Sequence, residues 1–319
     1  MNNKPLISIC IPVLNEEKNI HSLYQRLCDL RNKMEDECNL EFIFTDNNSK
    51  DNTWFLLQEI GLKDKNLKAI QFSKNYGFQR SIFANFLHAK GNAIMQIDAD
   101  LQDPPEMLEV FFKKWKDGYK VINGIRAKRN ENILMRFFRR FGYWFINLLS
   151  DSEIPQNVGD FRLIDRSVLE QLKKSKNTNP YLRGMIAEFG FKTIGIEYAR
   201  ESRNFGKSKF SLKKIILLGL NGLFNHSTLP LRGASFVGGF ILILSLLGAF
   251  YYLLLKVFSS DLPQGLASIH ILVLFGIGLN AFLLGIIGEY LLKIFLIIRA
   301  DPIAIIQETV NLSEDEIHI

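Results

Sequence analysis

Short runs rich in β-branched and aromatic residues alternate with longer amphipathic stretches in the N-terminal part of the chain, and this alternation constrains the fold most. The runs predicted as strands are Leu6–Ile11, Glu41–Thr45, Leu67–Phe72, Ala93–Ile97 and Val121–Asn123. The stretches predicted as helices between them are Glu16–Met34, Thr53–Ile60, Gln79–Ala89 and Pro105–Trp115. Such alternation predicts an α/β fold with a mainly parallel sheet covered by helices on both faces.

Polar loops follow three of these predicted strands. They are Asn15-Glu16-Glu17, the segment Asp46–Asp51, and Asp98-Ala99-Asp100-Leu101-Gln102-Asp103. One acidic loop is usually a turn with a helix cap, and Asp51 before Thr53 fits that interpretation. Parallel sheets bind ligands at the carboxyl ends of their strands, so three such loops at one edge predict a binding site.

The third loop has the pattern expected of a metal site. Asp98 and Asp100 come directly after an apolar strand and project two carboxylates from one strand end. Carboxylate oxygens are the ligands that hard divalent cations prefer. Such a cation would neutralise a diphosphate leaving group, which is the main electrostatic task in releasing a nucleotide from a sugar.

The composition narrows the class of function. The formal net charge of +6 is modest for 319 residues, and no nucleic-acid partner is expected. Cys10, Cys28 and Cys38 are odd in number and lack metal-binding spacing, which favours a reducing compartment. No signal peptide is recognisable at Met1–Pro5, so the N-terminal part is expected to stay in the cytoplasm.

Two long runs without formal charge distinguish the C-terminal third. One lies between Arg232 and Lys256 and the other between Asp261 and Glu289. Each exceeds the roughly 20 residues that a helix needs to cross a bilayer, which predicts transmembrane helices at about 233–256 and 267–298. A hairpin buried in a soluble domain is the alternative.

Basic residues flank this pair of runs. Lys213, Lys214 and Arg232 precede the first run and Arg299 follows the second, whereas the connection offers Lys256 and Asp261. The positive-inside rule then places both ends in the cytoplasm. We expect a multi-pass inner (plasma) membrane protein with a cytoplasmic catalytic domain at 1–230, two spans within 231–300 and a cytoplasmic tail at 301–319.

The motifs, in this order, resemble those of the family 2 glycosyltransferases of GT-A fold. Besides the three loops, the matching segments are Phe72–Gly77, Asn157–Leu163, Arg200–Phe210 and Gly288-Glu289-Tyr290. Within that family, the sequence is similar to the polyprenyl-phosphate glycosyltransferases, a group with dolichyl-phosphate mannose synthase and the bactoprenol glucosyltransferases. The resemblance covers roughly residues 5–300.

The resemblance implies roles for three groups of residues. The donor nucleoside would be surrounded by Pro12, Asn15, Glu16, Asp46 and Asn47. Mg2+ or Mn2+ would be held against the diphosphate by Asp98, Asp100 and Gln102. A flexible loop would close over the phosphates with Arg203, Ser208 and Lys209. The family's usual Asp-Asp-Gly-Ser is replaced here by Asp46-Asn47-Asn48-Ser49, in which Asn48 can still take the positive φ that a glycine would supply.

Asp100 and Asp160 are the residues that the resemblance implies for catalysis, and Asp160 lies where the family has its candidate base. A phosphate acceptor is already ionised near neutral pH, so it needs positioning and charge screening more than deprotonation. Asp160 is therefore expected either to act as a base or to align sugar or acceptor. A cap before Phe161 is the structural alternative.

Two segments ahead of the first apolar run, at about 131–150 and 211–229, are predicted to lie in the membrane surface. Ile133–Leu149 carries an apolar stripe with basic residues largely off it, which suits an interfacial helix, although a core-facing helix is the alternative. Arg126, Arg136 and Arg140 are expected to bind the acceptor phosphate, because a guanidinium binds phosphate oxygens in a fixed fork. Attraction to anionic headgroups is the other explanation.

The resemblance implies an inverting transferase that moves a sugar from a nucleotide sugar onto a polyprenyl phosphate, for modification of lipopolysaccharide O-antigen or another cell-envelope glycan. UDP-glucose and undecaprenyl phosphate are the expected substrates, with UDP-N-acetylglucosamine and GDP-mannose as alternative donors. The non-enzyme alternatives are a transporter or flippase component and a non-catalytic scaffold, and the intact pair Asp98 and Asp100 speaks against the scaffold. The family also suggests a homo-oligomer, a tetramer.

Overall fold

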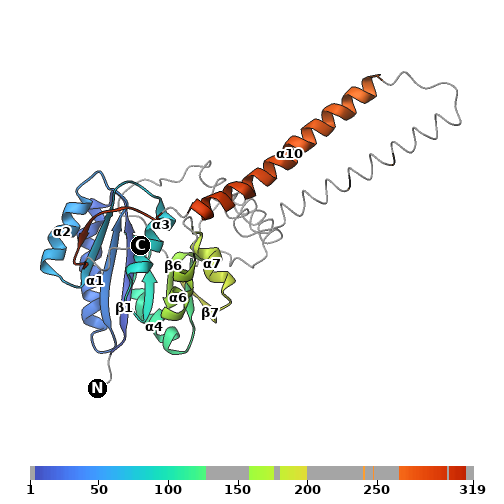
Figure 1. The fold of residues 1–319 in the computed structure, drawn as a ribbon. Coiled ribbons are helices and arrows are strands. Elements are labelled where there is room, and N and C mark those ends of the chain that lie inside the picture. The colour runs from blue at the N-terminus through green and yellow to red at the C-terminus, as the bar shows by residue number, and fades with distance from the viewer. Residues whose placement is uncertain are drawn as a thin grey trace, which may run out of the picture. The chain divides into compact units, whose positions relative to one another are not determined.

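The computed structural model describes residues 4–126, 158–175, 180–199, 266–299 and 302–313, together with Phe240 and Leu247 (Figure 1). The chain divides into two compact units. One unit comprises Met1–Tyr143, Ser152–Leu212 and Ala300–Ile319, and its described part carries the sheet. The other comprises Trp144–Asp151 and Lys213–Arg299, and it carries the long helix α10 (Leu266–Arg299).

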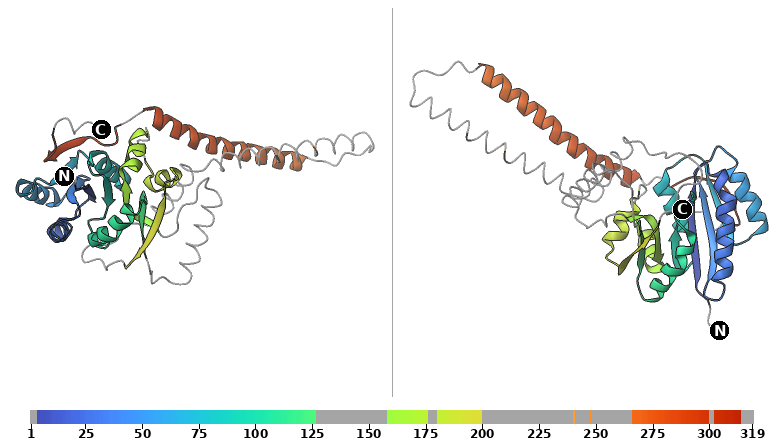
Figure 2. Two further views of the ribbon diagram at one scale, coloured as in Figure 1. Left: turned by 90° about the horizontal axis from the view of Figure 1, so that it is seen from below. Right: turned by 180° about the vertical axis from the view of Figure 1, so that it is seen from behind.

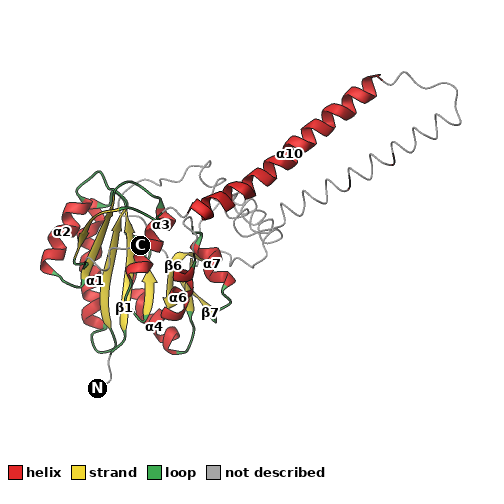
Figure 3. Cartoon of the chain, in the orientation of Figure 1, coloured by secondary structure: helices red, strands yellow, loops and turns green. Residues whose placement is uncertain are grey.

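The first unit is built on one eight-stranded sheet, in the order β7-β5-β6-β4-β1-β2-β3-β8. Its strands are β1 (Leu6–Val13), β2 (Asn39–Asp46), β3 (Leu67–Phe72), β4 (Ala93–Gln96), β5 (Val121–Arg126), β6 (Val158–Asp165), β7 (Thr193–Tyr198) and β8 (Ile306–Val310). Its helices are α1 (Glu17–Lys33), α2 (Thr53–Lys63), α3 (Phe78–His88), α4 (Leu108–Lys116), α6 (Arg166–Lys174) and α7 (Leu182–Glu188), with a 3-10 turn η1 (Pro105–Met107) (Figure 3).

Strand pairing makes the centre of this sheet parallel. β1 pairs in parallel with both β2 and β4, and β2 pairs in parallel with β3. β6 lies antiparallel between β4 and β5, and β5 pairs in parallel with β7. The chain therefore reverses its direction of travel across the sheet between β1 and β4, which is the position where sheets of this type bind ligands.

The sequence-based prediction of an α/β fold with a mainly parallel sheet is confirmed. All the strands and helices predicted up to Val121–Asn123 are present, with ends that differ by a few residues. The stretch predicted as one helix over Pro105–Trp115 begins with η1 before α4. The strands β6, β7 and β8 and the helices α6 and α7 were not predicted.

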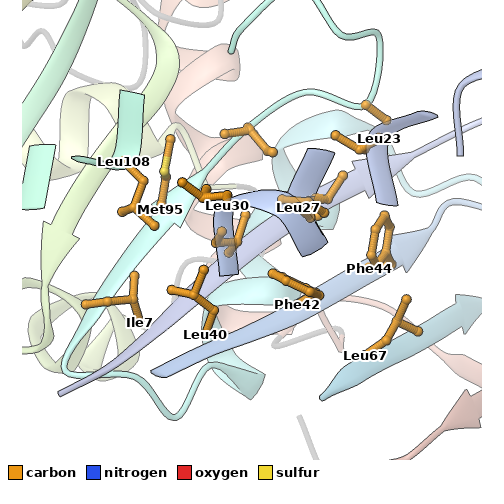
Figure 4. Packing of buried hydrophobic residues seen from close by; sticks show 14 of the residues in the cluster. Ile7, Leu23, Leu27, Leu30, Leu40, Phe42, Phe44, Leu67, Met95 and Leu108 are labelled. Carbon is orange, nitrogen blue, oxygen red and sulfur yellow. The ribbon is translucent and has the colours of Figure 1, made fainter. Parts of the chain in front are cut away.

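One face of the sheet is covered by α1, α2 and α4. The apolar positions of α1 recur every three or four residues, and they bury Ile20, Leu23, Leu27 and Leu30. These side chains pack over the sheet in the same cluster as Phe42 and Phe44 of β2 (Figure 4). Burying an aliphatic side chain of this size stabilises the fold by about 1.5–3 kcal/mol, so this stripe fixes α1 against the sheet.

The opposite face is covered by α3, α6 and α7. Their buried apolar side chains form a second cluster with Ile94 of β4, Val121 of β5 and Ile164 of β6. α7 contributes Leu182, Met185 and Ile186 to this cluster. The packing therefore holds the short helix α7 beside the sheet, and with it the polar residues at its start.

The helix α10 covers the range 267–298, where the second apolar run lies. The first run, at about 233–256, falls outside the described residues apart from Phe240 and Leu247. Among the described residues, no helix meets the combined requirement of length and apolarity for crossing a membrane.

The range 301–319, expected as a tail, contains β8, which pairs antiparallel with β3 at the edge of the sheet (Figure 2). Trp54 Nε1 in α2 donates to Glu308 Oε2 at 2.8 Å. The Asn311 side-chain amide donates to the carbonyl oxygens of Gly61 at 2.7 Å and of Leu67 at 2.8 Å. A Cβ on Gly61 would lie 2.3 Å from Val310 Cγ1, so a glycine is needed where the two segments meet.

We expect the hydrogen bonds of the Asn311 side chain to stabilise the packing of β8 against α2 and β3. Asn311→Ala removes its hydrogen bonds and places an alanine at a φ of 55°, so we expect a loss of about 2–3 kcal/mol in the free energy of unfolding. Asn311→Gly removes the same bonds but tolerates the positive φ, and should lose about 1 kcal/mol less. Thermal unfolding of the purified variants measures both. Equal losses would show that the backbone conformation contributes nothing.

Candidate functional site

The candidate site lies at the carboxyl edge of the sheet, which is formed by the ends of the parallel strands β1, β2, β3 and β4. Polar loops follow β1, β2 and β4 at this edge, as expected for parallel strands. β6 runs in the opposite direction, and its register pairs Arg162 with Gln96 of β4. The start of β6, which includes Asp160, therefore lies beside the loop that follows β4.

Hydrogen bonds join the loop after β1 to the loop after β2. Asn15 N donates to Ser49 Oγ at 2.8 Å, and Lys50 N donates to Asn15 Oδ1 at 2.7 Å. Glu16 N donates to Thr53 Oγ1 at 2.9 Å at the start of α2. The structure thus brings together Asn15 and Glu16, predicted to bind the donor, with the second predicted loop.

Asp46 and Asn47 hold the second loop in shape. Asp46 is fully buried and accepts hydrogen bonds from Ser49 N at 3.1 Å and from Gln71 Nε2 at 3.3 Å. Burial raises the pKa of Asp46 above its ordinary value. Asn47 Oδ1 accepts from Tyr76 N at 2.8 Å, and Asn48 has a φ of 62°. The prediction that Asn48 replaces a glycine at positive φ is confirmed.

The remaining predictions for these two loops have different outcomes. Asp51 Oδ1 accepts from Thr53 N at 3.1 Å and from Thr53 Oγ1 at 2.6 Å, so its role in the turn is confirmed, whereas the N-cap position of α2 is Asn52 and not Asp51. Pro12 is buried within β1, next to the start of the first loop. Binding of a nucleoside by Pro12, Asn15, Glu16, Asp46 and Asn47 stays a prediction.

The loop after β4 concentrates negative charge. Burial, together with the nearby carboxylates of Asp103, Asp100 and Asp160, raises the pKa of Asp98 to about 7. Asp100 is buried, and its Oδ1 accepts from Gln102 N at 3.2 Å. This turn holds Asp100 and Gln102, two of the three predicted metal ligands, on one short loop.

A buried leucine adds strain to the same loop. Leu101 has a φ of 59°, a left-handed conformation that costs a residue with a Cβ roughly 1–2 kcal/mol. It is 4% exposed, so packing holds it in place. Strained residues that their surroundings hold in this way are concentrated at functional sites.

Asp98, Asp100 and Gln102 fit a divalent cation. Their oxygen atoms are the donors that Mg2+ and Mn2+ accept. Burial and the nearby carboxylates raise the pKa of Asp98, and a bound cation would favour its charged form. The described residues contain no group of three or more His, Cys, Asp or Glu arranged to hold a metal ion. Mg2+ commonly binds to one or two carboxylates together with substrate phosphates, so a pair of aspartates is sufficient.

Asp103 ties the acidic loop to the ends of β5 and β7. Tyr198, the last residue of β7, donates its hydroxyl to Asp103 Oδ1 at 2.5 Å. Arg126, the last residue of β5, places Nη2 4.0 Å from Asp103 Oδ2, and its Nε donates to the Tyr198 hydroxyl at 3.4 Å. Arg126 was predicted to bind the acceptor phosphate, and the structure places it at the same edge, next to the predicted metal loop.

Asp160 lies within β6 and forms an ion pair with Arg183 of α7. Arg183 Nε donates to Asp160 Oδ1 at 2.8 Å and Arg183 Nη2 donates to Asp160 Oδ2 at 2.6 Å. Arg162 Nη2 lies 3.8 Å from Oδ1, and Gln79 Nε2 of α3 donates to Oδ2 at 3.4 Å. The capping interpretation of Asp160 is therefore wrong, because the residue lies in a strand and its partners come from three elements.

These partners determine the charge states in the cluster. Burial alone would raise the pKa of Asp160, but Arg183, Arg162 and the Gln79 hydrogen bond together hold it below its ordinary value. Burial lowers the pKa of Arg162 to about 10, which still leaves it protonated at neutral pH. Asp160 is thus a carboxylate between two guanidinium groups.

Sequence reasoning missed Gln79, Asp103, Arg183 and Tyr198. Asp103 is the last residue of the acidic loop Asp98–Asp103, and its position next to the predicted metal ligands was the available signal. Arg183 and Tyr198 have no local signal, because their partners are 23 and 95 residues away in the sequence. The predicted residues outside the described part of the chain are Arg136, Arg140, Arg203, Ser208 and Lys209.

Comparison with known proteins gives concordant matches. The family described as "Glycosyl transferase family 2" matches residues 8–173. A relative from Bacillus subtilis (strain 168), "Uncharacterized glycosyltransferase YkcC", is 37% identical over 98% of this chain and 96% of its own length. The "SfII prophage-derived bactoprenol glucosyl transferase" of Shigella flexneri is 32% identical over 95% of this chain and 98% of its own.

A solved structure is similar at a greater distance. Glucosyl-3-phosphoglycerate synthase from Mycobacterium tuberculosis, crystallised with Mn2+, uridine diphosphate and glucosyl-3-phosphoglycerate, aligns with a TM-score of 0.48 at 13% identity. The alignment covers 69% of this chain and 78% of that one.

The Asp160 cluster should give stability a defined pH dependence. Asp160→Asn removes the carboxylate that compensates the buried guanidinium of Arg162 and the partly exposed guanidinium of Arg183, so the free energy of unfolding should fall by about 2–4 kcal/mol at neutral pH. Because the folded-state pKa of Asp160 is below its ordinary value, the carboxylate stabilises the fold above about pH 4 and loses this effect as pH falls through the folded-state pKa. The difference from wild type should therefore shrink on acidification below about pH 4.

Urea unfolding of wild type and variant across this pH range measures the difference. Asp117→Asn is the control, because it removes an exposed carboxylate whose partner, Lys114 at 3.0 Å, is also exposed. A difference between wild type and Asp160→Asn that grew on acidification would contradict the assignment.

Proposed function

Because this chain belongs to glycosyl transferase family 2, we propose that it transfers a sugar from a nucleotide sugar onto a polyprenyl phosphate, with inversion at the anomeric carbon. It is a glycosyltransferase, and the proposal concerns its donor, acceptor, metal and location. UDP-glucose and undecaprenyl phosphate are the proposed substrates. They are supported by the similarity over nearly the whole chain to proteins named bactoprenol glucosyl transferase.

The observation that carries the proposal is the collection of carboxylates at the switch point between β1 and β4. Asp98 and Asp100 share one short loop there, next to Asp103 and Asp160. A cluster of like charges favours a ligand that brings positive charge, such as a nucleoside diphosphate sugar with its divalent cation. The joined loops around Asn15 and Ser49 at the same edge are the proposed nucleoside-binding surface.

In this proposal, Asp98, Asp100 and Gln102 hold Mg2+ or Mn2+ against the donor diphosphate. When bound, the cation supplies positive charge that stabilises the leaving nucleoside diphosphate. An acceptor phosphate oxygen forms the new bond to the anomeric carbon as the bond to the diphosphate breaks. The chain's own part is to orient these groups and screen their charge, since the acceptor phosphate is already ionised.

The lipid acceptor and the membrane location belong to the same proposal. The uncharged runs between Arg232 and Lys256 and between Asp261 and Glu289 support two membrane spans with both ends in the cytoplasm. Arg126 at the end of β5 precedes the segment with Arg136 and Arg140, the residues proposed to meet the lipid phosphate. Arg203, Ser208 and Lys209 are proposed to close over the donor phosphates.

The reaction should be measurable directly. Purified protein incubated with radiolabelled UDP-glucose, undecaprenyl phosphate and Mg2+ or Mn2+ should transfer label into the organic phase on extraction. EDTA should abolish the transfer and added metal should restore it. Asp100→Asn should lose most of the turnover, on the order of a hundredfold or more, while thermal unfolding shows that the fold persists.

Parallel reactions with UDP-N-acetylglucosamine and GDP-mannose identify the donor. Glu109→Gln is a matched acidic control, because Glu109 pairs with Lys33 at 2.7 Å on the surface of α4 and should keep wild-type turnover. Full activity in the presence of chelator would refute the metal role of Asp98 and Asp100. Hydrolysis of the UDP-sugar without transfer of the sugar to undecaprenyl phosphate would refute the proposed acceptor.

The proposed topology makes a separate prediction. Reporters fused at Met1 and Ile319 should both be cytoplasmic, while one inserted in the connection at 257–266 should be external, because basic residues flank the pair of runs. Alkaline phosphatase and fluorescent protein fusions give opposite signals on the two sides of the membrane. Termini on opposite sides would contradict the hairpin.

A further inference from the structure

We infer that Asp160 is a positioning residue that fixes the guanidinium of Arg183 at the carboxyl edge of the sheet, where Arg183 binds a phosphate oxyanion of a substrate. The inference rests on the proposed function, since it names how that site recognises phosphate. It assigns Asp160 a role different from the general base that the family resemblance implied. It also gives a function to Arg183, which no sequence motif indicated.

The geometry of the pair supports positioning. Both carboxylate oxygens of Asp160 accept from the guanidinium, at 2.8 Å from Nε and 2.6 Å from Nη2. This two-point contact fixes the plane of the guanidinium as well as its position, which a single contact does not. A guanidinium fixed in this way loses little conformational entropy when it binds a phosphate.

The same contacts make Asp160 a poor proton acceptor. Oδ1 also lies 3.8 Å from Arg162 Nη2, and Oδ2 also accepts from Gln79 Nε2. A general base needs an oxygen directed at the proton that it removes and a pKa near the working pH. Asp160 has both oxygens occupied by donors, its pKa is lowered, and the proposed acceptor carries no proton that must be removed first.

The net charge of the cluster suits an anion. Arg183 and Arg162 both contact the one carboxylate of Asp160, so these three side chains carry two positive charges and one negative charge. Arg162 is 4% exposed and anchors the cluster through Gly159 O at 2.7 Å. The Arg183 side chain is 30% exposed, so a ligand from solvent or from a membrane surface can reach it.

The position of Arg183 is itself well determined. Gln79 Oε1 accepts from Leu182 N at 3.2 Å, while its Nε2 donates to Asp160, so one side chain connects α3, β6 and the start of α7. Leu182, Met185 and Ile186 bury the apolar side of α7 against the sheet. Because β6 pairs with β4, Asp160 and the Arg183 side chain that contacts it lie beside the loop with the proposed metal site.

A phosphate oxyanion can reach Arg183 from two sources, the lipid acceptor or the donor diphosphate. The test is a double-mutant cycle of Asp160→Asn, Arg183→Ala and both together, with kcat and KM measured for undecaprenyl phosphate and UDP-glucose. Calorimetry with the UDP-sugar alone, without lipid, separates the two sources. Losing one charge-assisted phosphate contact weakens binding about tenfold to a hundredfold.

We expect each single substitution to raise KM for one phosphate substrate by about tenfold to a hundredfold, with a smaller effect on kcat. The KM of the double variant should lie within about twofold of the KM of the more impaired single variant, because both substitutions act through the guanidinium of Arg183. Arg183→Lys keeps the charge but loses the fork, so its effect should be intermediate. Asp160→Asn should keep the shape of the wild-type pH profile of kcat.

A second Arg–Asp ion pair serves as a matched control, and it lies at the amino ends of the parallel strands, away from the candidate site. Arg31 Nη1 contacts Asp64 Oδ2 at 2.7 Å, and the exposed fractions of these side chains, 29% and 9%, are close to those of Arg183 and Asp160. Arg31→Ala and Asp64→Asn should change stability but leave KM within about twofold of wild type. Circular dichroism at the assay temperature confirms that each variant is folded.

Three outcomes would overturn the inference while the proposed function stands. They are a loss of kcat in Asp160→Asn with its pH profile altered, additive effects in the double variant, or unchanged KM in both Arg183→Ala and Arg183→Lys. If wild type itself transfers no sugar to lipid, the proposed function fails. In that case, Arg183→Ala that binds the UDP-sugar as tightly as wild type removes the remaining support for the inference.

Discussion

The parallel pairing of β1 with both β2 and β4 is the constraint on which the candidate site depends. It forces the loops after these strands to one edge, where Asn15, Ser49 and Asp100 lie on neighbouring loops. The packing on the two faces holds this arrangement, since α1 and α4 cover one side and α3 and α7 the other. The antiparallel strand β6 then delivers Asp160 to the same edge from the opposite direction, which a fully parallel sheet would not do.

Charge at this edge is divided into two neighbouring parts of opposite sign. The loop after β4 crowds carboxylates together, and burial, with the nearby carboxylates adding to it, raises the pKa of Asp98 to about 7. The β6–α7 cluster has the reverse balance, with two guanidinium groups around one buried carboxylate. The negative charge of Asp103 is partly offset, since the Tyr198 hydroxyl donates to it and Arg126 Nη2 lies 4.0 Å away. In the proposed function, the acidic part favours the divalent cation that accompanies the donor diphosphate, and the basic part favours a phosphate oxyanion, because each part attracts a partner of opposite charge.

The sequence predicted the elements and residues whose signals are local. The strands up to β5, the helices between them, the loop with Asp98 and Asp100, and the positive φ of Asn48 all follow from patterns a few residues long. The pair of Asp160 with Arg183 and the contact of Asp103 with Tyr198 depend on which strands become neighbours, and no local pattern contains that information. The direction of β6 was missed for the same reason, because an alternation of strands and helices does not specify where an antiparallel strand is inserted.

The edge strand β8 has a consequence for how the protein is made. It pairs with β3, yet some 230 residues, including all of α10, separate the two strands in the chain. During translation, the strands that precede β8 in the chain are synthesised before it, so the outer side of β3 lacks its partner until β8 has been made. An unpaired strand edge is a template for pairing with another chain, so a nascent polypeptide, or one truncated before β8, exposes the side of β3 that β8 covers in the folded protein.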